Sequence, residues 1–331
     1  MTIPAGIVKM YFRLSGRQKK FDNEREFEVH LEECRIMNMK DYEMPARWDF
    51  GKPRKSKEFC GNPCYIINPG KDVAIVYLHG GSGIHQMLSF HYKFLKKLLR
   101  LADVTIYLPI YPLSPDNTYK ECYEMLDAVY AEVVEFYGRI TVMGDSMGGN
   151  IALGLSEHVE RKPDTTVLIS PWLDMSMDDS RYPEYYLREP RLSMNELKRC
   201  GDCWSVGTDK KDPLVSPLYG DLSGLDITVL VGTEEVLLLD SQRLRDRAMA
   251  EGIDIHYYEY EGMTHDFPLQ PIKEAEDAMQ KILEHIARSP AGEDGDECDG
   301  KCDPSDADSA EELVDPEVGA DEVSDEEQKR R

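Results

Sequence analysis

The sequence contains no long hydrophobic run. No stretch of its 331 residues approaches the about 20 consecutive apolar residues that a membrane-spanning helix requires. Residues 1–30 are interrupted by several lysine and arginine side chains and lack the apolar centre of a secretion signal. These absences predict a cytoplasmic protein without a membrane span.

An excess of positive charge is absent as well. The formal net charge is -24, and residues 290–331 contain 17 acidic against 4 basic side chains. Nucleic acid is therefore not an expected partner, because surfaces that bind it are basic. The same terminal segment has almost no large apolar side chains to bury, so we expect an acidic, disordered tail. An interaction tail is the alternative interpretation.

Cysteine pairs with zinc-ribbon spacing are also lacking. The eight cysteines include three close pairs in three separate regions: Cys60 and Cys64, Cys200 and Cys203, and Cys298 and Cys302. Without a secretion signal, reduced thiols are the expected state. We therefore predict neither a bound metal nor a cofactor.

The chain does contain a regular alternation of strand and helix patterns. After a hairpin at 57–67, continuous apolar runs predict strands at 72–78, 104–108, 140–143, 165–170, 226–231 and 254–260. Apolar stripes and caps between and after them predict helices at 90–99, 118–138, 147–160, 236–251 and 273–288. This alternation predicts an α/β fold, with a mostly parallel central sheet and helices on both faces.

Two segments do not follow the alternation. Residues 1–55 show only weak helical periodicity and precede every strand, and residues 178–207 carry a helix near 193–204 but no strand pattern. We expect both segments to form a helical cap. The catalytic core would then consist of residues 56–177 and 208–289, followed by the acidic tail.

A nucleophile motif lies between the strand at 140–143 and the following helix. The apolar run ends in Gly144-Asp145-Ser146-Met147-Gly148 and passes directly into helix-forming residues. A serine in such a tight strand-to-helix turn exposes its hydroxyl, and glycines on either side tolerate the crowding. The following helix directs its positive dipole end toward an anion formed beside Ser146. An incidental serine in a glycine-rich turn is the alternative for this motif alone.

A serine hydroxyl becomes an effective nucleophile when an imidazole removes its proton. Four of the eight histidines follow Ser146, but only His265 lies in an expected loop at the carboxyl edge of the sheet. His265 is therefore the predicted general base. The carboxylate that orients it would come from Glu234 or Glu235, after the strand at 226–231, and residue chemistry does not rank the two.

The stretch His79-Gly80-Gly81-Ser82-Gly83 follows the strand at 72–78. Backbone amides in such a glycine-rich loop can approach the negative oxygen of a tetrahedral intermediate closely. A phosphate-binding loop is the alternative, but the stretch has neither a Gly-x-Gly-x-x-Gly nor a Walker lysine pattern. The loop is therefore predicted to form an oxyanion hole.

In this order, the motifs resemble those of the hormone-sensitive-lipase-like (HGGxG) carboxylesterases of the α/β-hydrolase fold. The resemblance covers about residues 72–288 and includes Tyr-Pro-Leu-Ser-Pro at 111–115, Asp-Pro-Leu-Val-Ser-Pro at 212–217 and Gly-Met-x-His at 262–265. It implies a cap built from the N-terminal segment and an insertion after the sixth core strand. It also implies these roles: Ser146 as nucleophile, His265 as base, Glu235 as the acid where the family usually has aspartate, and the amides of Gly81, Ser82 and Met147 as the oxyanion hole.

The predicted function is a serine carboxylesterase that hydrolyses small, short-acyl esters through an acyl-enzyme. Amide or peptide hydrolysis by the same triad and a non-catalytic small-molecule receptor are the alternatives. Bulky side chains in the 178–207 segment predict a small, partly apolar pocket, or equally the packing of the cap on the sheet: Tyr182, Tyr185, Tyr186, Leu187, Leu192, Met194 and Trp204.

Overall fold

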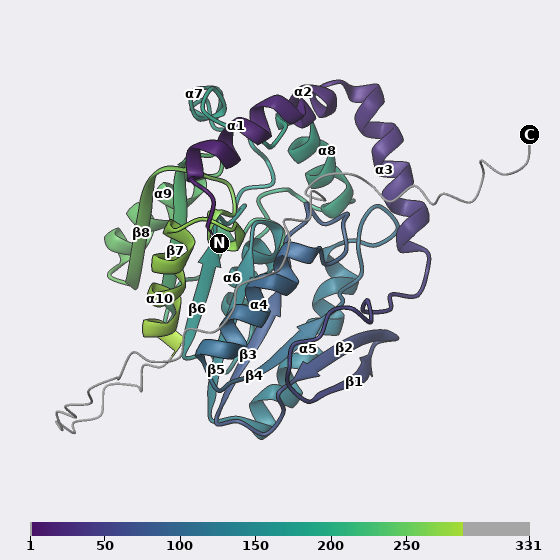
Figure 1. Cartoon of the computed structure of the whole chain (residues 1–331), viewed down its shortest axis with the longest axis vertical. Helices are drawn as coiled ribbons and strands as arrows, with labels where there is room; N and C mark the ends of the chain where they lie inside the picture. Colours follow the sequence, from purple (N-terminus) through teal and green to yellow (C-terminus); the bar gives the residue numbers. More distant parts are fainter. Residues whose placement is uncertain (1, 287–331) are drawn as a thin grey trace, which may run out of the picture. The chain divides into compact units, whose positions relative to one another are not determined.

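The computed structural model describes residues 2–286, so the predicted tail at 290–331 lies outside the described residues (Figure 1). An eight-stranded sheet has the order β1-β2-β4-β3-β5-β6-β7-β8. The strands are β1 (Arg54–Phe59), β2 (Asn62–Ile67), β3 (Val73–Leu78), β4 (Thr105–Pro109), β5 (Arg139–Asp145), β6 (Thr165–Ile169), β7 (Asp226–Glu234) and β8 (Asp254–Thr264). The helices are α1 (Ala5–Ser15), α2 (Arg17–Asp22), α3 (Glu24–Asn38), α4 (Ser89–Leu101), α5 (Tyr119–Phe136), α6 (Met147–His158), α7 (Tyr182–Tyr186), α8 (Met194–Trp204), α9 (Leu238–Glu251) and α10 (Glu274–Ile286).

The sheet is antiparallel at one edge and parallel elsewhere. Strand β2 pairs antiparallel with β1 and β4, whereas the pairs from β4 through β3, β5, β6 and β7 to β8 are all parallel. Parallel neighbours require crossover connections, and helices supply most of them here. The predicted α/β architecture with a mostly parallel sheet is thus confirmed.

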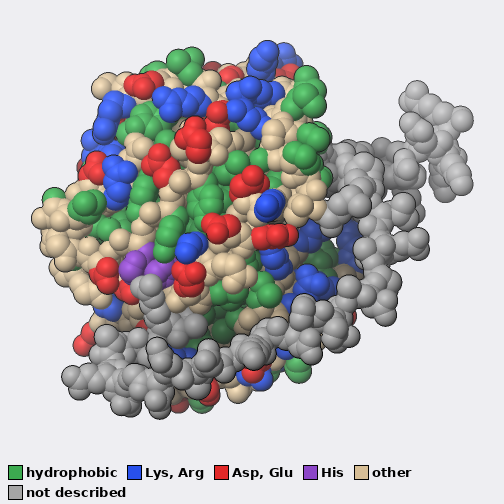
Figure 2. Space-filling model, turned by 60° about the vertical axis from the view of Figure 1, so that its left-hand side comes forward, with side chains coloured by type: hydrophobic (Ala, Val, Ile, Leu, Met, Phe, Trp, Pro, Cys, Tyr) green, Lys and Arg blue, Asp and Glu red, His purple; other side chains and the backbone are tan. Residues whose placement is uncertain are grey.

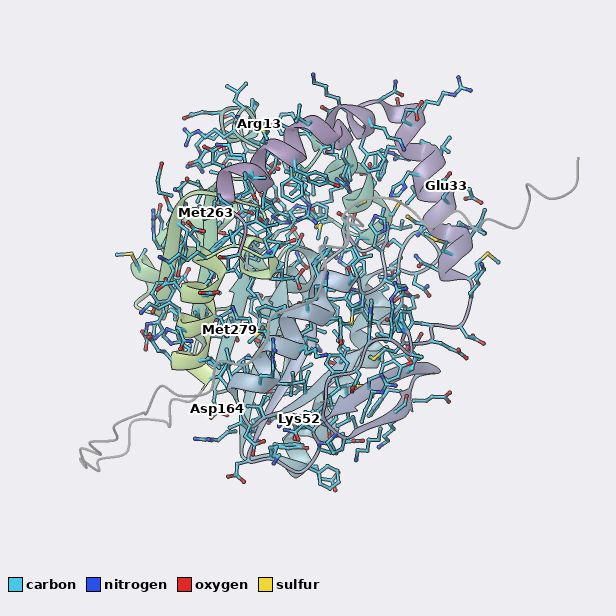
Figure 3. All side chains as sticks on the ribbon, viewed as in Figure 1. Arg13, Glu33, Lys52, Asp164, Met263 and Met279 are labelled. Atoms are coloured by element: carbon cyan, nitrogen blue, oxygen red, sulfur yellow. The ribbon has the colours of Figure 1, made fainter. Side chains whose placement is uncertain are left out.

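Hydrophobic cores lie on both faces of the sheet. Successive side chains of β3 alternate between them: Ala74, Val76 and Leu78 join one core, and Val73, Ile75 and Tyr77 join the other. Helices α5, α6 and α9 contribute to the first core, whereas α4 and α10 contribute to the second, which includes Met263 and Met279 (Figure 3). Because both faces are covered, β3 reads as a continuous apolar run in the sequence.

The loops after β7 and β8 begin later than the sequence predicts, because both strands are longer than expected. Strand β7 continues to Glu234 and β8 to Thr264, with an irregularity in their pairing between Gly232 and Glu234. A Cβ on Gly232 would lie 2.2 Å from the carbonyl oxygen of Met263, so glycine permits this close pairing. The extension of β8 places His265 directly after a strand. Helix α5 likewise ends earlier than expected, at Phe136.

The two segments outside the alternation pack against each other. Helices α1, α2, α3 and α8 lie beyond the ends toward which the parallel strands point (Figure 1). Arg17 of α2 binds the buried Glu196 of α8 through two nitrogens, at 2.7 and 2.8 Å. The Ser193 hydroxyl donates to Asp22 at 2.7 Å. These contacts join parts of the chain that are more than 170 residues apart.

Charges of both signs are interspersed on the face shown in Figure 2. Among residues 2–286, surface ion pairs such as Lys9–Glu234 and Lys71–Asp103 have N–O distances of 2.6 and 2.8 Å. Individually such exposed pairs contribute little to stability. No helix in the described part of the chain has the length and apolarity needed to cross a bilayer.

Candidate active site

Ser146 lies in a sharp turn between β5 and α6. Its backbone has φ 53° and ψ −116°, a conformation that a serine keeps only where surrounding structure imposes it. A Cβ on Gly144 would lie 2.1 Å from the carbonyl oxygen of Gly148, and one on Gly148 would lie 1.9 Å from that of Leu78. This crowding is the physical reason for the Gly-x-Ser-x-Gly spacing.

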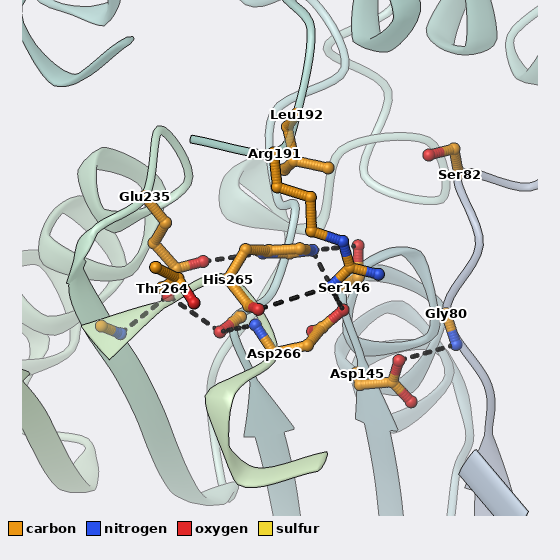
Figure 4. Close-up of polar contacts among 12 residues, drawn as sticks. Gly80, Ser82, Asp145, Ser146, Arg191, Leu192, Glu235, Thr264, His265 and Asp266 are labelled. Atoms are coloured by element: carbon orange, nitrogen blue, oxygen red, sulfur yellow. Dashed lines mark hydrogen bonds and ion pairs between the residues drawn. The ribbon is translucent and has the colours of Figure 1, made fainter. Parts of the chain in front are cut away.

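Three side chains from three chain segments meet at this turn (Figure 4). Nε2 of His265 lies 3.0 Å from Oγ of Ser146, and Nδ1 of His265 lies 2.7 Å from Oε2 of Glu235. Ser146, Glu235 and His265 follow the ends of β5, β7 and β8, which run parallel and therefore end at one edge. All three residues are buried. The structure thus brings together a serine, an imidazole and a carboxylate in a continuous chain of hydrogen bonds.

The adjacent glutamates have different partners. Oε2 of Glu234 pairs with Nζ of Lys9 in α1 at 2.6 Å and is partly exposed. Glu235 is fully buried, and its Oε1 accepts hydrogen bonds from the Gly232 amide at 2.7 Å and the Ser170 hydroxyl at 2.8 Å. Its other oxygen is left for His265. The geometry therefore favours Glu235 over Glu234 as the partner of the imidazole.

Burial has opposite effects on the two members of this pair. It raises the pKa of Glu235 to about 8, although hydrogen bonds from Gly232 and Ser170 act in the other direction. Burial also lowers the pKa of His265 below its usual value. A neutral imidazole can accept a proton from Ser146, and its Nδ1–H then donates to Glu235.

The loop at residues 79–83 lies on the side of Ser146 opposite Glu235 (Figure 4). The Gly80 amide donates to Oδ2 of Asp145 at 3.0 Å, so it is already engaged. Gly81 has φ 124° and Ser82 has φ 55°, both in the region that favours glycine. Met147 is the first residue of α6, where amides lack an intrahelical acceptor.

Asp145 holds this loop in place, a role that the sequence analysis did not assign. Its buried carboxylate accepts hydrogen bonds from the Tyr77 hydroxyl, the Gly80 amide and Nε2 of His91, the last at 3.1 Å. Burial raises the pKa of Asp145, but His91 and Tyr77 outweigh burial and the net pKa is lowered. The one feature of the sequence that could have indicated this role is the presence of a charged residue inside the nucleophile motif.

Two further charged residues lie beside His265 and were also missed (Figure 4). Oδ2 of Asp266 is 3.2 Å from Nε2 of His265. Nη1 of Arg191 lies 3.6 Å from the same carboxylate oxygen and 3.4 Å from the carbonyl oxygen of His265. The Arg191 guanidinium also packs over the rings of Phe12 and Phe90, at 5.3 and 5.6 Å. The 178–207 segment therefore contributes a cation directly to the site.

The bulky residues of this segment have several different environments. Tyr182 and Trp204 are buried in the first core, and Leu192 and Met194 also pack there. The hydroxyl groups of Tyr185 and Tyr186 donate to Gln242 and Asp22, whereas Leu187 is exposed. A Cβ on Gly83 would lie 3.6 Å from a ring carbon of Trp204, so this indole packs against the 79–83 loop. Most of these side chains therefore connect the segment to the rest of the protein.

The chain is similar to known hydrolases and esterases. The model of the alpha/beta hydrolase fold family matches residues 75–269. The chain is 30% identical over 222 residues to an esterase of Acinetobacter venetianus, covering 63% of this chain and 73% of that protein. It is 30% identical over 199 residues to an acetyl-hydrolase of Streptomyces hygroscopicus, covering 58% and 67%. A solved hormone-sensitive lipase from a metagenome library has a TM-score of 0.71 at 23% identity, covering 87% of this chain and 99% of that one.

The family match covers more than half of the chain and contains both strand-end turns that carry the serine and the histidine. The solved lipase shares the fold over nearly its whole length. The predicted α/β-hydrolase fold and the resemblance to hormone-sensitive-lipase-like esterases are both confirmed. The chain belongs to the alpha/beta hydrolase family, among its hormone-sensitive-lipase-like esterases, and is a serine hydrolase.

Proposed function

We propose that this protein is a carboxylesterase for small, short-acyl esters, with Ser146 as nucleophile, His265 as general base and Glu235 as the orienting acid. The observation that carries the proposal is the continuous chain of hydrogen bonds from Ser146 through His265 to Glu235. An intact chain of this kind favours an enzyme over a non-catalytic receptor on the same fold.

In the acylation step, Oγ of Ser146 attacks the ester carbonyl carbon while Nε2 of His265 takes its proton. Glu235 stabilises the imidazolium that forms and holds its Nδ1–H in place. The carbonyl oxygen becomes negative, and the proposed donors to it are the amides of Gly81, Ser82 and Met147. The imidazolium then protonates the leaving alcohol, which departs and leaves the acyl group on Ser146.

Water completes the cycle. His265 removes a proton from a water molecule, and the resulting hydroxide attacks the acyl carbonyl. The same backbone amides would stabilise the second tetrahedral intermediate. Its collapse breaks the bond to Oγ, and His265 returns the proton to Ser146. The products are a carboxylic acid and an alcohol, and the enzyme is regenerated.

We also propose that residues 1–55 and 178–207 act together as a cap over the core segments 56–177 and 208–289. The pairing of Arg17 with the buried Glu196 and the position of Arg191 beside His265 support this division. We further propose a cytoplasmic location for the protein, which rests on the sequence alone.

Short acyl groups are the proposed specificity. Support comes from the Streptomyces relative, which is an acetyl-hydrolase, and from the Pseudomonas putida relative, an ethyl acetate hydrolase at 27% identity over 254 residues. A triacylglycerol lipase of Mycobacterium tuberculosis is also similar, at 27% identity over 203 residues. The dependence of activity on the length of the acyl chain is therefore the property to measure.

We expect kcat/KM to be highest for acetyl to hexanoyl esters and at least about 10-fold lower for long-chain esters, a difference of about 1.4 kcal/mol in transition-state binding. The measurement is a p-nitrophenyl ester series below its solubility limit, followed by emulsified triglycerides. A p-nitroanilide with the preferred acyl group tests amide hydrolysis under the same conditions. Faster cleavage of emulsified long-chain substrates would contradict the short-acyl assignment, and a faster anilide would contradict the ester assignment.

The acid limb of the pH profile should lie lower than that of an ordinary histidine. Because burial lowers the pKa of His265, its imidazole stays neutral and able to accept a proton below about pH 6.5. We expect kcat/KM for a short ester to keep its plateau there and to fall only at lower pH, as His265 becomes protonated. Circular dichroism at each pH serves as the folding control. An acid limb centred above about pH 7 would show that His265 is stabilised in its charged form.

A further inference from the structure

A cluster of nitrogen and sulfur side chains lies behind the 79–83 loop and is not used by the triad. His30 and Cys34 are one turn apart on α3, and His85 follows the loop by two residues. Nε2 of His30 is 3.2 Å from Nε2 of His85, and Sγ of Cys34 is 3.5 Å from Nε2 of His30 and 3.6 Å from Nδ1 of His85. The candidate ligand atoms all lie within 4.8 Å of one another.

For either nitrogen of His85, two of the three ligand separations match those around one tetrahedral metal ion. Zinc–nitrogen bonds of about 2.0–2.1 Å and zinc–sulfur bonds of about 2.3 Å, at tetrahedral angles, separate two nitrogens by about 3.3 Å and a nitrogen from a sulfur by about 3.6 Å. A cation would bind only one nitrogen of the His85 ring. Nε2 of this ring lies near His30, and Nδ1 lies near Cys34. The ligand atoms of all three residues lie within 4.8 Å of one another, so the remaining pair would approach when the three ligands meet at one cation.

The surroundings also suit a metal site. His30 and Cys34 are buried, and the ring of Phe21 stacks on that of His30 with centroids 4.6 Å apart. Glu33, which lies on α3 (Figure 3), places Oε2 3.8 Å from Nδ1 of His30. This separation exceeds that of a hydrogen bond, so the carboxylate would favour a bound cation through its charge. Two imidazoles and a thiol prefer zinc and similar transition metals to magnesium or calcium.

We propose that His30, Cys34 and His85 form a binding site for a divalent transition-metal cation of the zinc type. Water would supply the fourth ligand. The site would link α3 of the N-terminal segment to the 79–83 loop, because the His85 amide donates to the carbonyl oxygen of Gly81 at 3.0 Å. The cation would thus stabilise the loop conformation and take no part in bond cleavage.

The competing explanation is a hydrogen bond between two neutral imidazoles, which a distance of 3.2 Å also allows. The two explanations differ in metal affinity and in spectrum. Full-length protein, reduced and freed of metal with a chelator, would be titrated with Zn²⁺ against a chromophoric chelator and separately with Co²⁺. We expect one tight Zn²⁺ equivalent at this cluster and a thiolate-to-cobalt charge-transfer band. Zn²⁺ should also raise the melting temperature, because it binds the folded state.

Substitutions at Cys34 and His85 test whether these residues bind the metal. Cys34→Ser should remove the charge-transfer band, and Cys34→Ser and His85→Gln should each weaken Zn²⁺ binding by at least about 100-fold. Matched controls outside the cluster are Cys60→Ser, an exposed thiol, His256→Gln, from an acidic cluster with Asp226 and Asp254, and a double Cys298→Ser/Cys302→Ser change. Each control should keep the cobalt band and the affinity.

The proposal is overturned if wild-type protein shows no cobalt–thiolate band, a result that does not depend on any variant folding. It is also overturned if the double change in the terminal segment removes the band while Cys34→Ser retains it. Circular dichroism and melting curves would establish that the Cys34 and His85 variants are folded before their affinities are compared.

Discussion

Ser146→Ala should lower kcat for a short ester by about 10⁴-fold or more, because it removes the hydroxyl that we propose forms the acyl-enzyme. The hydroxyl lies 3.0 Å from Nε2 of His265, the proposed base. Alanine is smaller than serine, so the crowded turn can accommodate it. The wild-type protein should release p-nitrophenol in a burst equal to the enzyme concentration. The variant should show no burst.

A conservative change at a neighbouring buried serine provides the control. Ser170→Ala removes the hydrogen bond that this hydroxyl donates to Glu235 and the one that it accepts from the Asp266 amide, but it keeps the side chains of Ser146 and His265. We expect it to retain the burst with a smaller loss of rate. If purified, folded Ser146→Ala kept a burst and substantial turnover, another residue would have to be the nucleophile.

Glu235→Gln should reduce kcat by a factor on the order of 10⁴, the size of effect seen when a triad acid is replaced by its amide. The amide cannot stabilise the imidazolium, and its NH₂ group can favour the wrong tautomer of His265. The 2.7 Å contact between Oε2 of Glu235 and Nδ1 of His265 is the contact that changes. The measurement is kcat and KM for a short ester at the pH optimum.

Glu234→Gln is the matched control, because it makes the same chemical change one residue earlier. Glu234 pairs with Lys9 and Arg13 at the surface, where ion pairs contribute little to stability, so activity and melting temperature should stay near those of the wild type. Equal, mild losses from both variants would show that a different carboxylate orients the base. Asp266, 3.2 Å from Nε2 of His265, would then be the next residue to change.

The sequence by itself determined the architecture and most of the proposed site. Apolar runs separated by amphipathic helices predict a sheet covered on both faces, because strands buried on both sides cannot alternate polar and apolar residues. The crowding around Ser146 forces glycines on both sides, so this turn has a local sequence pattern. His265 could be selected because the other histidines after Ser146 lie within regular elements.

Residue chemistry did not rank the two adjacent glutamates, and the geometry of the tertiary structure favours Glu235, the residue that the family resemblance implied. Their chemistry is identical, and the choice depends on how β7 pairs with β8 and on Lys9, which arrives from a helix more than 200 residues away in the chain. Arg191 reaches His265 from the 178–207 segment, and His85 meets His30 and Cys34 across more than 50 residues. Such contacts leave no periodic pattern, because each depends on the packing of separate elements and not on local backbone geometry.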